Sequence, residues 1–167
     1  MNTSHTNPRA LGPSDEEAFY ALRIDALTLS PHSYGNHLDA WKAARREQVL
    51  ALLNHSASLS DGVILGAFDS EGALMGMLGI RRETKPNVRH KATLWGFFVR
   101  PQARNQGLGR ALVAEAIQRA QGYSGLHHVR LIVTATDHAA QHVFTSQGFV
   151  TYGLEPNGIC CAGQMLD

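Results

Sequence analysis

Residues 99–112 are Val99-Arg100-Pro101-Gln102-Ala103-Arg104-Asn105-Gln106-Gly107-Leu108-Gly109-Arg110-Ala111-Leu112. The apolar run before them, residues 94–99, predicts a strand that breaks at Pro101. A polar turn with two glycines follows, and apolar residues at helical spacing then predict a helix from Leu108. Amides at a helix N-terminus carry partial positive charge, and glycines let a bulky anion approach them closely. The segment therefore predicts a turn that binds a phosphate group.

The composition is that of an ordinary globular domain. The chain has 167 residues, of which 44% are apolar and 17% are charged. This length suits one well-buried core. The net charge of +1 gives no reason to expect a nucleic-acid or membrane partner. Since neither a signal peptide nor a membrane-spanning run is found, we expect a cytoplasmic protein, with residues 1–8 as a flexible tail and residues 9–167 as one domain.

The sequence predicts no metal site. The two cysteines, Cys160 and Cys161, are adjacent, and a bridge between neighbours requires a strained turn, so we expect free thiols. The nine histidines show no spacing typical of metal ligands.

The apolar pattern predicts a single α/β domain with a mixed, mostly antiparallel sheet of about six strands and four helices, in the order βααβββαβαβ. Ser14 and Glu17 predict a capping box at the first helix, and Gly96 predicts a bulge. The C-terminal residues 159–167 predict at most a short, weak strand. The expected strands are 9–11, 63–68, 73–83, 88–99, 129–134 and 149–154, and the expected helices run from Ser14 to Leu29 and over 37–54, 108–121 and 137–147.

Two other phosphate-binding motifs fit the turn poorly. A P-loop requires Lys-Ser or Lys-Thr after its last glycine, and Gly109 is followed by Arg110-Ala111. A dinucleotide fingerprint requires a third small residue where Leu112 stands, and its turn lies directly on a first strand. A plain strand-turn-helix connection, with two glycines for sharp bending, remains an alternative.

The segment Arg104-Asn105-Gln106-Gly107-Leu108-Gly109 fits the pattern Arg/Gln-x-x-Gly-x-Gly/Ala and resembles the acetyl-coenzyme-A loop of the GNAT superfamily of N-acetyltransferases. The downstream pattern Asp137-x-x-Ala140-x-x-x-Phe144-x-x-x-Gly148-Phe149 follows in family order. The resemblance runs from about Arg9 to Leu154. It implies a single GNAT-like domain over residues 9–167 and acetyl-CoA as the cofactor.

By this resemblance, the backbone amides from Gln106 to Arg110 would hold the pyrophosphate of acetyl-CoA, and Arg104 would flank it. The backbone of Phe98 and Val99 would pair with the pantetheine arm, in a gap where the fourth and fifth strands splay apart. The cofactor-binding residues implied in this way are Phe98, Val99, Arg104, Asn105, Gln106, Gly107, Leu108, Gly109, Arg110, Asp137, Ala140 and Phe144.

Removal of the amine proton is the larger chemical task in acetyl transfer. A lysine-like amine with a pKa near 10.4 is disfavoured by roughly 4 to 5 kcal/mol at pH 7, whereas a thiol leaving group costs about 2 kcal/mol. The chain departs from the family at the position of the general acid. Phe144 stands where many members have a tyrosine that can protonate the departing sulfur. Either Tyr152 or water supplies that proton, or the thiolate leaves unaided. Asp137 stands where an asparagine is usual, and we expect it to cap a helix.

Glu83 and His90 are the candidate general bases, although structural roles are open for both. The face that we expect to be shared by Thr93, Trp95 and Phe97 offers no carboxylate. The candidate acceptor-binding residues are Tyr34, His32, Trp95 and Phe97. Such a wall favours an amino-acid-like or small aromatic amine over a polyamine.

The predicted function is transfer of an acetyl group from acetyl-CoA to a primary amine of a small molecule or peptide, directly within a ternary complex. The alternatives are an acyl-CoA-binding module without transferase activity and a dinucleotide-dependent reductase. Because the C-terminal strand is weak, the sequence leaves two alternatives open: one wall of the acceptor site is thin, or a second subunit of a homodimer completes it.

Overall fold

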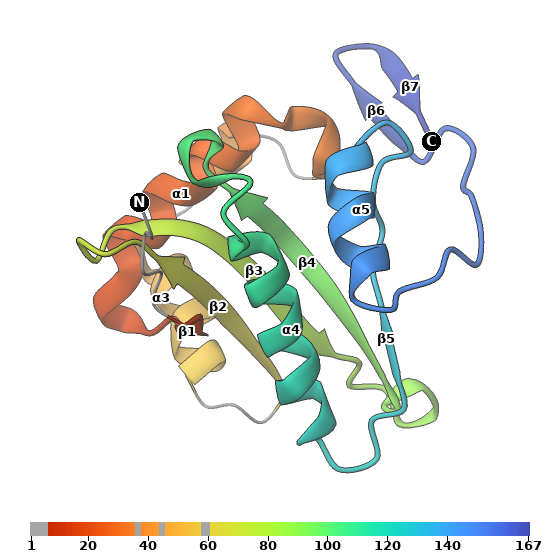
Figure 1. The fold of residues 1–167 in the computed structure, drawn as a ribbon, viewed down its shortest axis with the longest axis horizontal. Coiled ribbons are helices and arrows are strands. Elements are labelled where there is room, and N and C mark those ends of the chain that lie inside the picture. The colour runs from red at the N-terminus through yellow and green to blue at the C-terminus, as the bar shows by residue number, and fades with distance from the viewer. Residues whose placement is uncertain (1–6, 36–37, 44–45, 58–60) are drawn as a thin grey trace.

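The computed structural model describes residues 7–35, 38–43, 46–57 and 61–167. The main sheet has the order β1-β2-β3-β4-β5 and is antiparallel except for the parallel pair β4 and β5 (Figure 1). The mixed, mostly antiparallel α/β fold is thus confirmed, with five strands in this sheet instead of about six. The strands are β1 (Arg9–Ala10), β2 (Gly62–Phe68), β3 (Leu74–Arg82), β4 (Lys91–Val99) and β5 (His128–Arg130).

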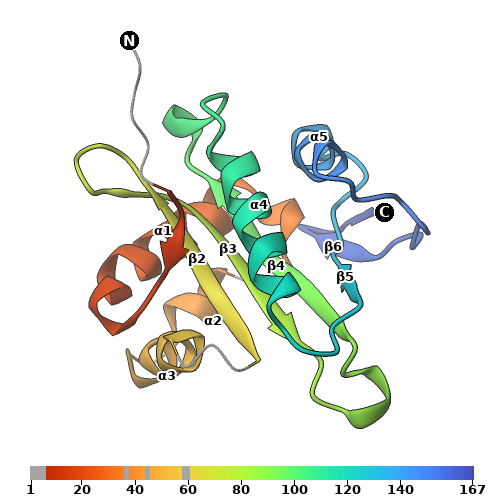
Figure 2. The ribbon, with the colours of Figure 1, turned by 60° about the horizontal axis from the view of Figure 1, so that its bottom comes forward.

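Helices cover both faces of the sheet (Figure 2). One face packs on α1 (Glu16–Leu29), α2 (Leu38–Lys42) and α3 (Arg46–Ala57), and the other on α4 (Leu108–Gln121) and α5 (His138–Ser146). Each face has its own core, with Leu22 and Phe19 on the α1 side and Leu112 and Val113 on the α4 side. The single helix predicted over 37–54 is two helices, α2 and α3. Residues 1–6, which hold most of the predicted tail, and residues 36–37 lie outside the described part of the chain.

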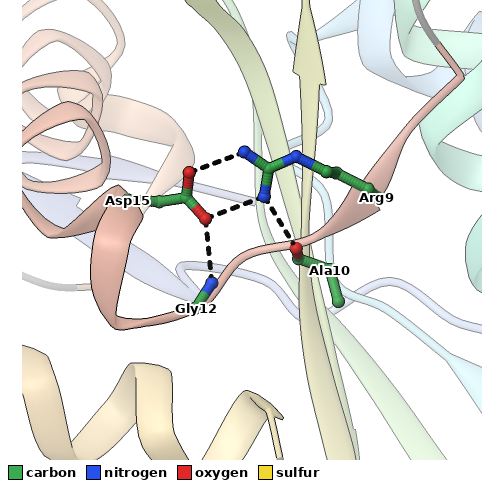
Figure 3. A network of polar contacts seen from close by, with 4 residues as sticks. All are labelled: Arg9, Ala10, Gly12 and Asp15. Carbon is green, nitrogen blue, oxygen red and sulfur yellow. Dashed lines mark hydrogen bonds and ion pairs between the residues drawn. The ribbon is translucent and has the colours of Figure 1, made fainter.

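The start of α1 differs from the predicted capping box. A 3-10 turn, Pro13–Asp15, precedes α1, and the carboxylate of Asp15 accepts a 2.9 Å hydrogen bond from the amide of Gly12 (Figure 3). Arg9 donates two further bonds to the same carboxylate, of 2.8 and 2.7 Å. Asp15, and not Ser14, is therefore the residue that immediately precedes α1, and its carboxylate bonds back to Gly12 and Arg9 and makes no capping bond to the helix.

The bulge predicted at Gly96 is confirmed. Gly96, with a φ of +68°, and Phe97 both stand opposite the single residue Leu78 of β3. The extra residue reverses the alternation of side chains along β4. Trp95 consequently packs in the α1-side core and Phe97 in the α4-side core. The expectation that Phe97 shares a face with Trp95 is wrong for this reason.

The strands β4 and β5 separate soon after they meet. They pair over three residues, from Lys91 opposite His128 to Thr93 opposite Arg130, and then diverge toward α5 (Figure 1). Residues 131–134, which the sequence predicts as part of the strand, have no strand partner among the described residues. The predicted splay between the fourth and fifth strands is present.

The C-terminal part departs most from the prediction. The segment 149–154 forms no strand, and Val150 and Tyr152 are 82% and 76% exposed. Because β5 stops at Arg130, it leaves little edge on which this segment could pair. The last residues form a separate hairpin of β6 (Ile159–Cys161) and β7 (Gln164–Leu166), where at most one strand was expected. Within the described ranges, no helix has the length and apolar character needed to cross a bilayer.

Candidate functional site

A cavity lies where β4 and the chain after β5 part. Its walls come from the loop after α1, from Leu78 of β3, from β4 around the Gly96 bulge, from the segment after β5, and from α5. The lining residues are Ser33, Tyr34, Leu78, Leu94, Trp95, Gly96, Phe97, Leu131, Ile132, Val133, Thr134, Asp137, Ala140 and Phe144. Among them, Asp137 is the only carboxylate that the described residues contribute.

Asp137 connects two walls of the cavity. Its Oδ1 accepts a 3.0 Å hydrogen bond from the amide of Ala140 and so caps α5, as predicted. Its Oδ2 accepts a 3.2 Å bond from the hydroxyl of Ser33 in the loop after α1. Close by, the Thr134 hydroxyl donates to the carbonyl of His32 at 2.7 Å. These bonds hold the loop after α1 against the start of α5.

Tyr34 is the second polar group in the wall. Its hydroxyl donates a 2.6 Å hydrogen bond to the carbonyl of Phe97. Burial raises the pKa of Tyr34 well above its ordinary value, and the nearby charges of Arg23 and Asp137 act in opposite directions on it. Tyr34 therefore stays protonated at neutral pH.

The predicted phosphate-binding turn lies between β4 and α4. Asn105 and Gly107 both have positive φ values, of 60° and 86°, which turn the chain sharply into the helix. No acceptor in the described part of the chain takes a hydrogen bond from the backbone amides of residues 106–110. The glycine at 109 also serves packing, because a Cβ there would lie 3.1 Å from Cζ of Phe97. The turn thus presents several free donors at a helix N-terminus.

The edge of β4 that faces the cavity carries no neighbouring strand. Beyond Thr93 the strand pairs with β3 alone, and at this edge the carbonyl of Val99 accepts a 3.0 Å bond from Nε of Arg104. The guanidinium of Arg104 lies 5.9 Å from the ring centroid of Phe98. Arg104 is therefore held between the open edge and the phosphate-binding turn.

The α5 residues of the predicted set meet β4 at the cavity. Phe144 and Ala140 are buried and line it, and the Phe144 ring lies 5.0 Å from that of Phe97. Phe144 has no hydroxyl to donate. On the outer side, Nη2 of Arg110 lies 3.3 Å from Nε2 of His142, which links α4 to α5.

The three candidate acid-base residues lie away from this cavity. Glu83 accepts hydrogen bonds of 3.2 Å from Thr93 and from Arg130 where β4 and β5 are paired. His90 precedes the same pairing and accepts bonds from the amides of residues 127 and 128 through its backbone carbonyl. Tyr152 is 76% exposed. The structure brings none of the three to the cavity wall.

The predicted acceptor residues divide in a similar way. Tyr34, Trp95 and Phe97 line the cavity, whereas His32 is exposed and is not among the lining residues. Both cysteines are free, as predicted. In the described part of the chain, no three His, Cys, Asp or Glu residues gather closely enough to hold a metal ion.

Arg23, which contacts the cavity-lining Tyr34, is not among the residues predicted from the sequence. This α1 residue is 3% exposed, and its guanidinium lies 4.8 Å from the ring centroid of Tyr34. Helical spacing could have found it, because Arg23 follows Phe19 by four residues and precedes Ala26 by three, on the apolar side of the helix.

Comparisons with known proteins agree with this architecture. The sequence profile of the Acetyltransferase (GNAT) family matches residues 21–149. A GNAT-family acetyltransferase from Streptococcus pneumoniae superposes with a TM-score of 0.86 at 27% identity, covering 98% of this chain and 95% of that one. No curated protein matches the chain in sequence.

Two further solved structures contain acetyl-CoA. A putative acetyltransferase from Salmonella typhimurium, with its cofactor acetyl-CoA, has a TM-score of 0.82 at 19% identity and covers 98% and 90% of the two chains. A phosphinothricin acetyltransferase from Sinorhizobium meliloti, in complex with acetyl-CoA, has a TM-score of 0.81 at 16% identity and covers 99% and 84%. The profile match spans most of the chain and coincides with the splayed sheet and the turn before α4. The chain belongs to the acetyltransferase (GNAT) family.

Proposed function

We propose that this protein transfers the acetyl group of acetyl-CoA to a primary amine of a small molecule or peptide, directly within a ternary complex. The observation that carries the proposal is the set of free amides over residues 106–110, next to the open edge of β4. Free donors at a helix N-terminus suit a diphosphate, and an unpaired strand edge suits an extended chain that carries amides.

The residues present fit coenzyme A. Gly107, at a φ of +86°, keeps the turn open to a bulky anion, and Arg104 adds a positive charge beside it. The backbone of Phe98 and Val99 would hold the pantetheine arm, and Ala140 and Phe144 would cover it from α5. Bound acetyl-CoA supplies a thioester whose acetyl carbon bonds to the amine nitrogen as the C–S bond breaks, while the amine loses one proton and the sulfur gains one.

The chain's own polar groups act on the acceptor. The Asp137 carboxylate lies in the cavity wall, where it attracts an ammonium group and accepts a hydrogen bond from the amine. Tyr34 is protonated and already donates to a carbonyl, so it is no base. The acceptor therefore reacts through its neutral fraction and loses its proton to water, since no histidine stands among the lining residues of the cavity.

The experiment that tests this function has two stages. Thermal unfolding in the presence of CoA, NAD or ATP shows which of them stabilises the protein. We expect CoA to raise the Tm, and NAD and ATP to leave it unchanged. Thiol release from acetyl-CoA is then followed with a panel of amines. Stabilisation by NAD or ATP in place of CoA would overturn the proposal.

An acyl-CoA-binding module without transferase activity is the second candidate. The observation that favours it is Phe144, which lines the cavity without a hydroxyl that could protonate the sulfur. Binding of CoA with no thiol release from any amine in the panel would support the module. The size of the thiol barrier, about 2 kcal/mol, favours the enzyme, because a thiolate can leave unaided.

The homodimer, one of the two alternatives that the sequence leaves open, stays a prediction. The exposed apolar side chains of Ile132, Val150 and Tyr152, which are 88%, 82% and 76% exposed, support it. Sedimentation velocity over a range of protein concentrations checks it, and a single monomer boundary at all of them would contradict it.

A further inference from the structure

Two basic side chains meet beside the phosphate-binding turn. Nη2 of Arg110, in the first turn of α4, lies 3.3 Å from Nε2 of His142 on α5, and both residues are exposed. None of the ion pairs in the described part of the chain includes either residue. The Arg110–His142 pair therefore places a positive charge without a carboxylate partner at the surface, next to the free amides of residues 106–110.

The donors of the Arg110–His142 pair are open to a stronger acceptor. A guanidinium only donates hydrogen bonds, so Nε2 of His142 is the acceptor in this contact. A phosphate oxygen carries negative charge, and hydrogen bonds from a guanidinium to a charged oxygen are shorter and stronger than those to a neutral group. The planar fork of an arginine also fits two phosphate oxygens at once. A phosphate that reaches Arg110 can thus replace the imidazole as the acceptor.

The chemistry of coenzyme A supplies such a phosphate close to the turn. With the diphosphate on the amides of residues 106–110, the pantetheine arm runs inward along the open edge of β4. The ribose hangs from the other end of the diphosphate, so it lies outside the turn. Only this ribose separates the 3′-phosphate from the diphosphate, and one arginine side chain can span that distance. The 3′-phosphate is consequently within reach of the side chains that border the turn.

Two surfaces border the turn, and they differ in charge. Toward β2, the described residues that line a hollow are all uncharged: Asn7, Pro8, Ala67, Gln106, Gly107, Leu108 and Ala111. On the other side, α4 and α5 lie next to each other, and Arg110 and His142 meet between them (Figures 1 and 2). Arg104, another cation near the turn, is bonded to the carbonyl of Val99 at the edge of β4. A phosphate monoester carries about −1.5 to −2 charges at pH 7, so it favours the side of α5.

We propose that Arg110 and His142 bind the 3′-phosphate of coenzyme A, so that the protein prefers CoA over 3′-dephospho-CoA. This inference rests on the proposed function, because it takes the diphosphate to lie on the turn. On binding, the guanidinium of Arg110 exchanges the imidazole for phosphate oxygens, and the ring of His142 donates an N–H to a further oxygen. No covalent bond changes at this pair, so it acts on the affinity for the cofactor and not on the chemical step.

A purely structural role for the Arg110–His142 pair predicts a different outcome. If the contact served only to join α4 to α5, Arg110→Gln would lower the Tm of the free protein and would weaken the binding of CoA and of 3′-dephospho-CoA equally. If the pair binds the phosphate, the loss of affinity falls on CoA alone. The Tm of the free protein should then change little, because exposed charged contacts contribute little to stability.

The experiment measures the Kd of CoA and of 3′-dephospho-CoA, which differ only in that phosphate, by isothermal titration calorimetry. The proteins are the wild type, Arg110→Gln, His142→Gln and Arg119→Gln. Arg110→Gln keeps the backbone amide of residue 110, so the contact with the diphosphate remains. Arg119→Gln is the matched control, because it removes the same charge from the same helix about 14 Å further along its axis, where Arg119 pairs with Glu115.

We expect the wild type to bind CoA about 30-fold more tightly than 3′-dephospho-CoA, since charged hydrogen bonds to the phosphate are made only with CoA. Arg110→Gln should reduce this preference to about threefold and His142→Gln to about tenfold, whereas Arg119→Gln should keep it. Higher NaCl concentrations should reduce the preference of the wild type, because the pair is exposed. Equal affinities of the wild type for the two ligands, or a preference that Arg110→Gln leaves unchanged, would overturn the proposal. The wild-type result decides even if a variant fails to fold.

The same ligands separate this inference from the proposed function. Binding of CoA with no preference over 3′-dephospho-CoA contradicts the 3′-phosphate site alone. A preference for CoA that is lost in Arg110→Gln, without thiol release from acetyl-CoA in the presence of any amine, contradicts the transfer reaction alone. Failure of the wild type to bind CoA contradicts both.

Discussion

The hydroxyl of Ser33 lies 3.2 Å from Oδ2 of Asp137, joining residues 104 positions apart in the sequence. The same carboxylate caps α5 through the amide of Ala140. One side chain therefore fixes the start of a helix and the position of the loop that bounds the cavity. Its charge and its hydrogen-bonding geometry can be varied separately.

Asp137→Ala should lower the free energy of unfolding by about 1 to 2 kcal/mol, because the helix cap and the bond from Ser33 are both lost. Asp137→Asn keeps an oxygen that can cap the helix and should stay within about 0.5 kcal/mol of the wild type. Urea unfolding measures both values. If the charge attracts the ammonium group, Asp137→Asn should still raise KM for the amine, and an unchanged KM would argue against that role.

Gly107→Ala should weaken CoA binding and destabilise the fold by about 1 to 2 kcal/mol, because an alanine is strained at a φ of +86°. The affinity is measured by titration with CoA, and the stability by urea unfolding. Gly153→Ala is the control, since no heavy atom lies within 4 Å of a Cβ built there. Equal CoA affinities in the two variants would contradict the assignment of the turn.

Phe144→Tyr places a phenol in the cavity wall, where many members of the family carry one. We expect kcat to rise by up to about tenfold, as a donor becomes available to the departing sulfur. The free energy of unfolding should fall by about 1 kcal/mol if the hydroxyl has no partner in the free protein. Phe149→Tyr is the control, because that ring lies 5.7 Å from Phe144 and does not line the cavity.

The pH profile tests the assignment of the proton. Without a base in the wall, log kcat/KM should rise with a slope of about one from pH 6 to near the pKa of the acceptor amine. His90 lies outside the cavity, so His90→Gln should leave the profile unchanged. A plateau above about pH 7 that disappears in His90→Gln would identify His90 as the base instead. The raised pKa of Tyr34 keeps its own titration out of this range.

Asp15 should make the free energy of unfolding depend on pH in the acidic range. Its pKa is lowered, first by the hydrogen bonds from Arg9 and then by that from the amide of Gly12, against the opposing effect of burial (Figure 3). A lowered pKa in the folded state stabilises the fold fully above the unfolded pKa of about 4, and this contribution is lost as the pH falls through the folded value. Asp15→Asn should therefore cost about 1 to 3 kcal/mol at pH 7 and much less near pH 2.

Urea unfolding at both pH values measures that difference. Glu17→Gln is the matched control, because Glu17 is an exposed acid at the start of the same helix. Its effect should be small at both pH values. A loss of stability in Asp15→Asn that does not shrink in acid would contradict the ion pair as its source.

The elements predicted most accurately from the sequence are those with strong local signals. The helix Leu108–Gln121 has its predicted bounds, and Asp137 caps α5, because apolar spacing and capping chemistry act within a few residues. The predictions were wrong where the structure of a segment depends on a partner strand that is distant in the sequence. Residues 149–154 have the alternation of a strand but lie exposed, because β5 is too short to pair with them.

The candidate site shows the same division. The turn around Gly107 could be predicted because its two glycines, Gly107 and Gly109, are separated by a single residue in the sequence. The cavity could not, since its walls come from five segments that are far apart in the sequence, and the bulge at Gly96 moves Phe97 to the face opposite Trp95. Glu83 and His90 appeared suitable as bases because the sequence does not say where β4 and β5 stop pairing. Arg23 carried a local signal, a charge on the apolar side of a helix, but is not among the residues predicted from the sequence.

Three residue pairs join β4 to β5, and the gap between the two strands opens beyond the last of these pairs. Each additional residue pair between β4 and β5 would strengthen the sheet and would also narrow the gap between the two strands. Thermostabilising designs that lengthen β5 toward Thr134 should therefore raise the melting temperature and abolish nucleotide binding together. In such a protein, ligand binding depends on a stretch of strand edge that stays unpaired.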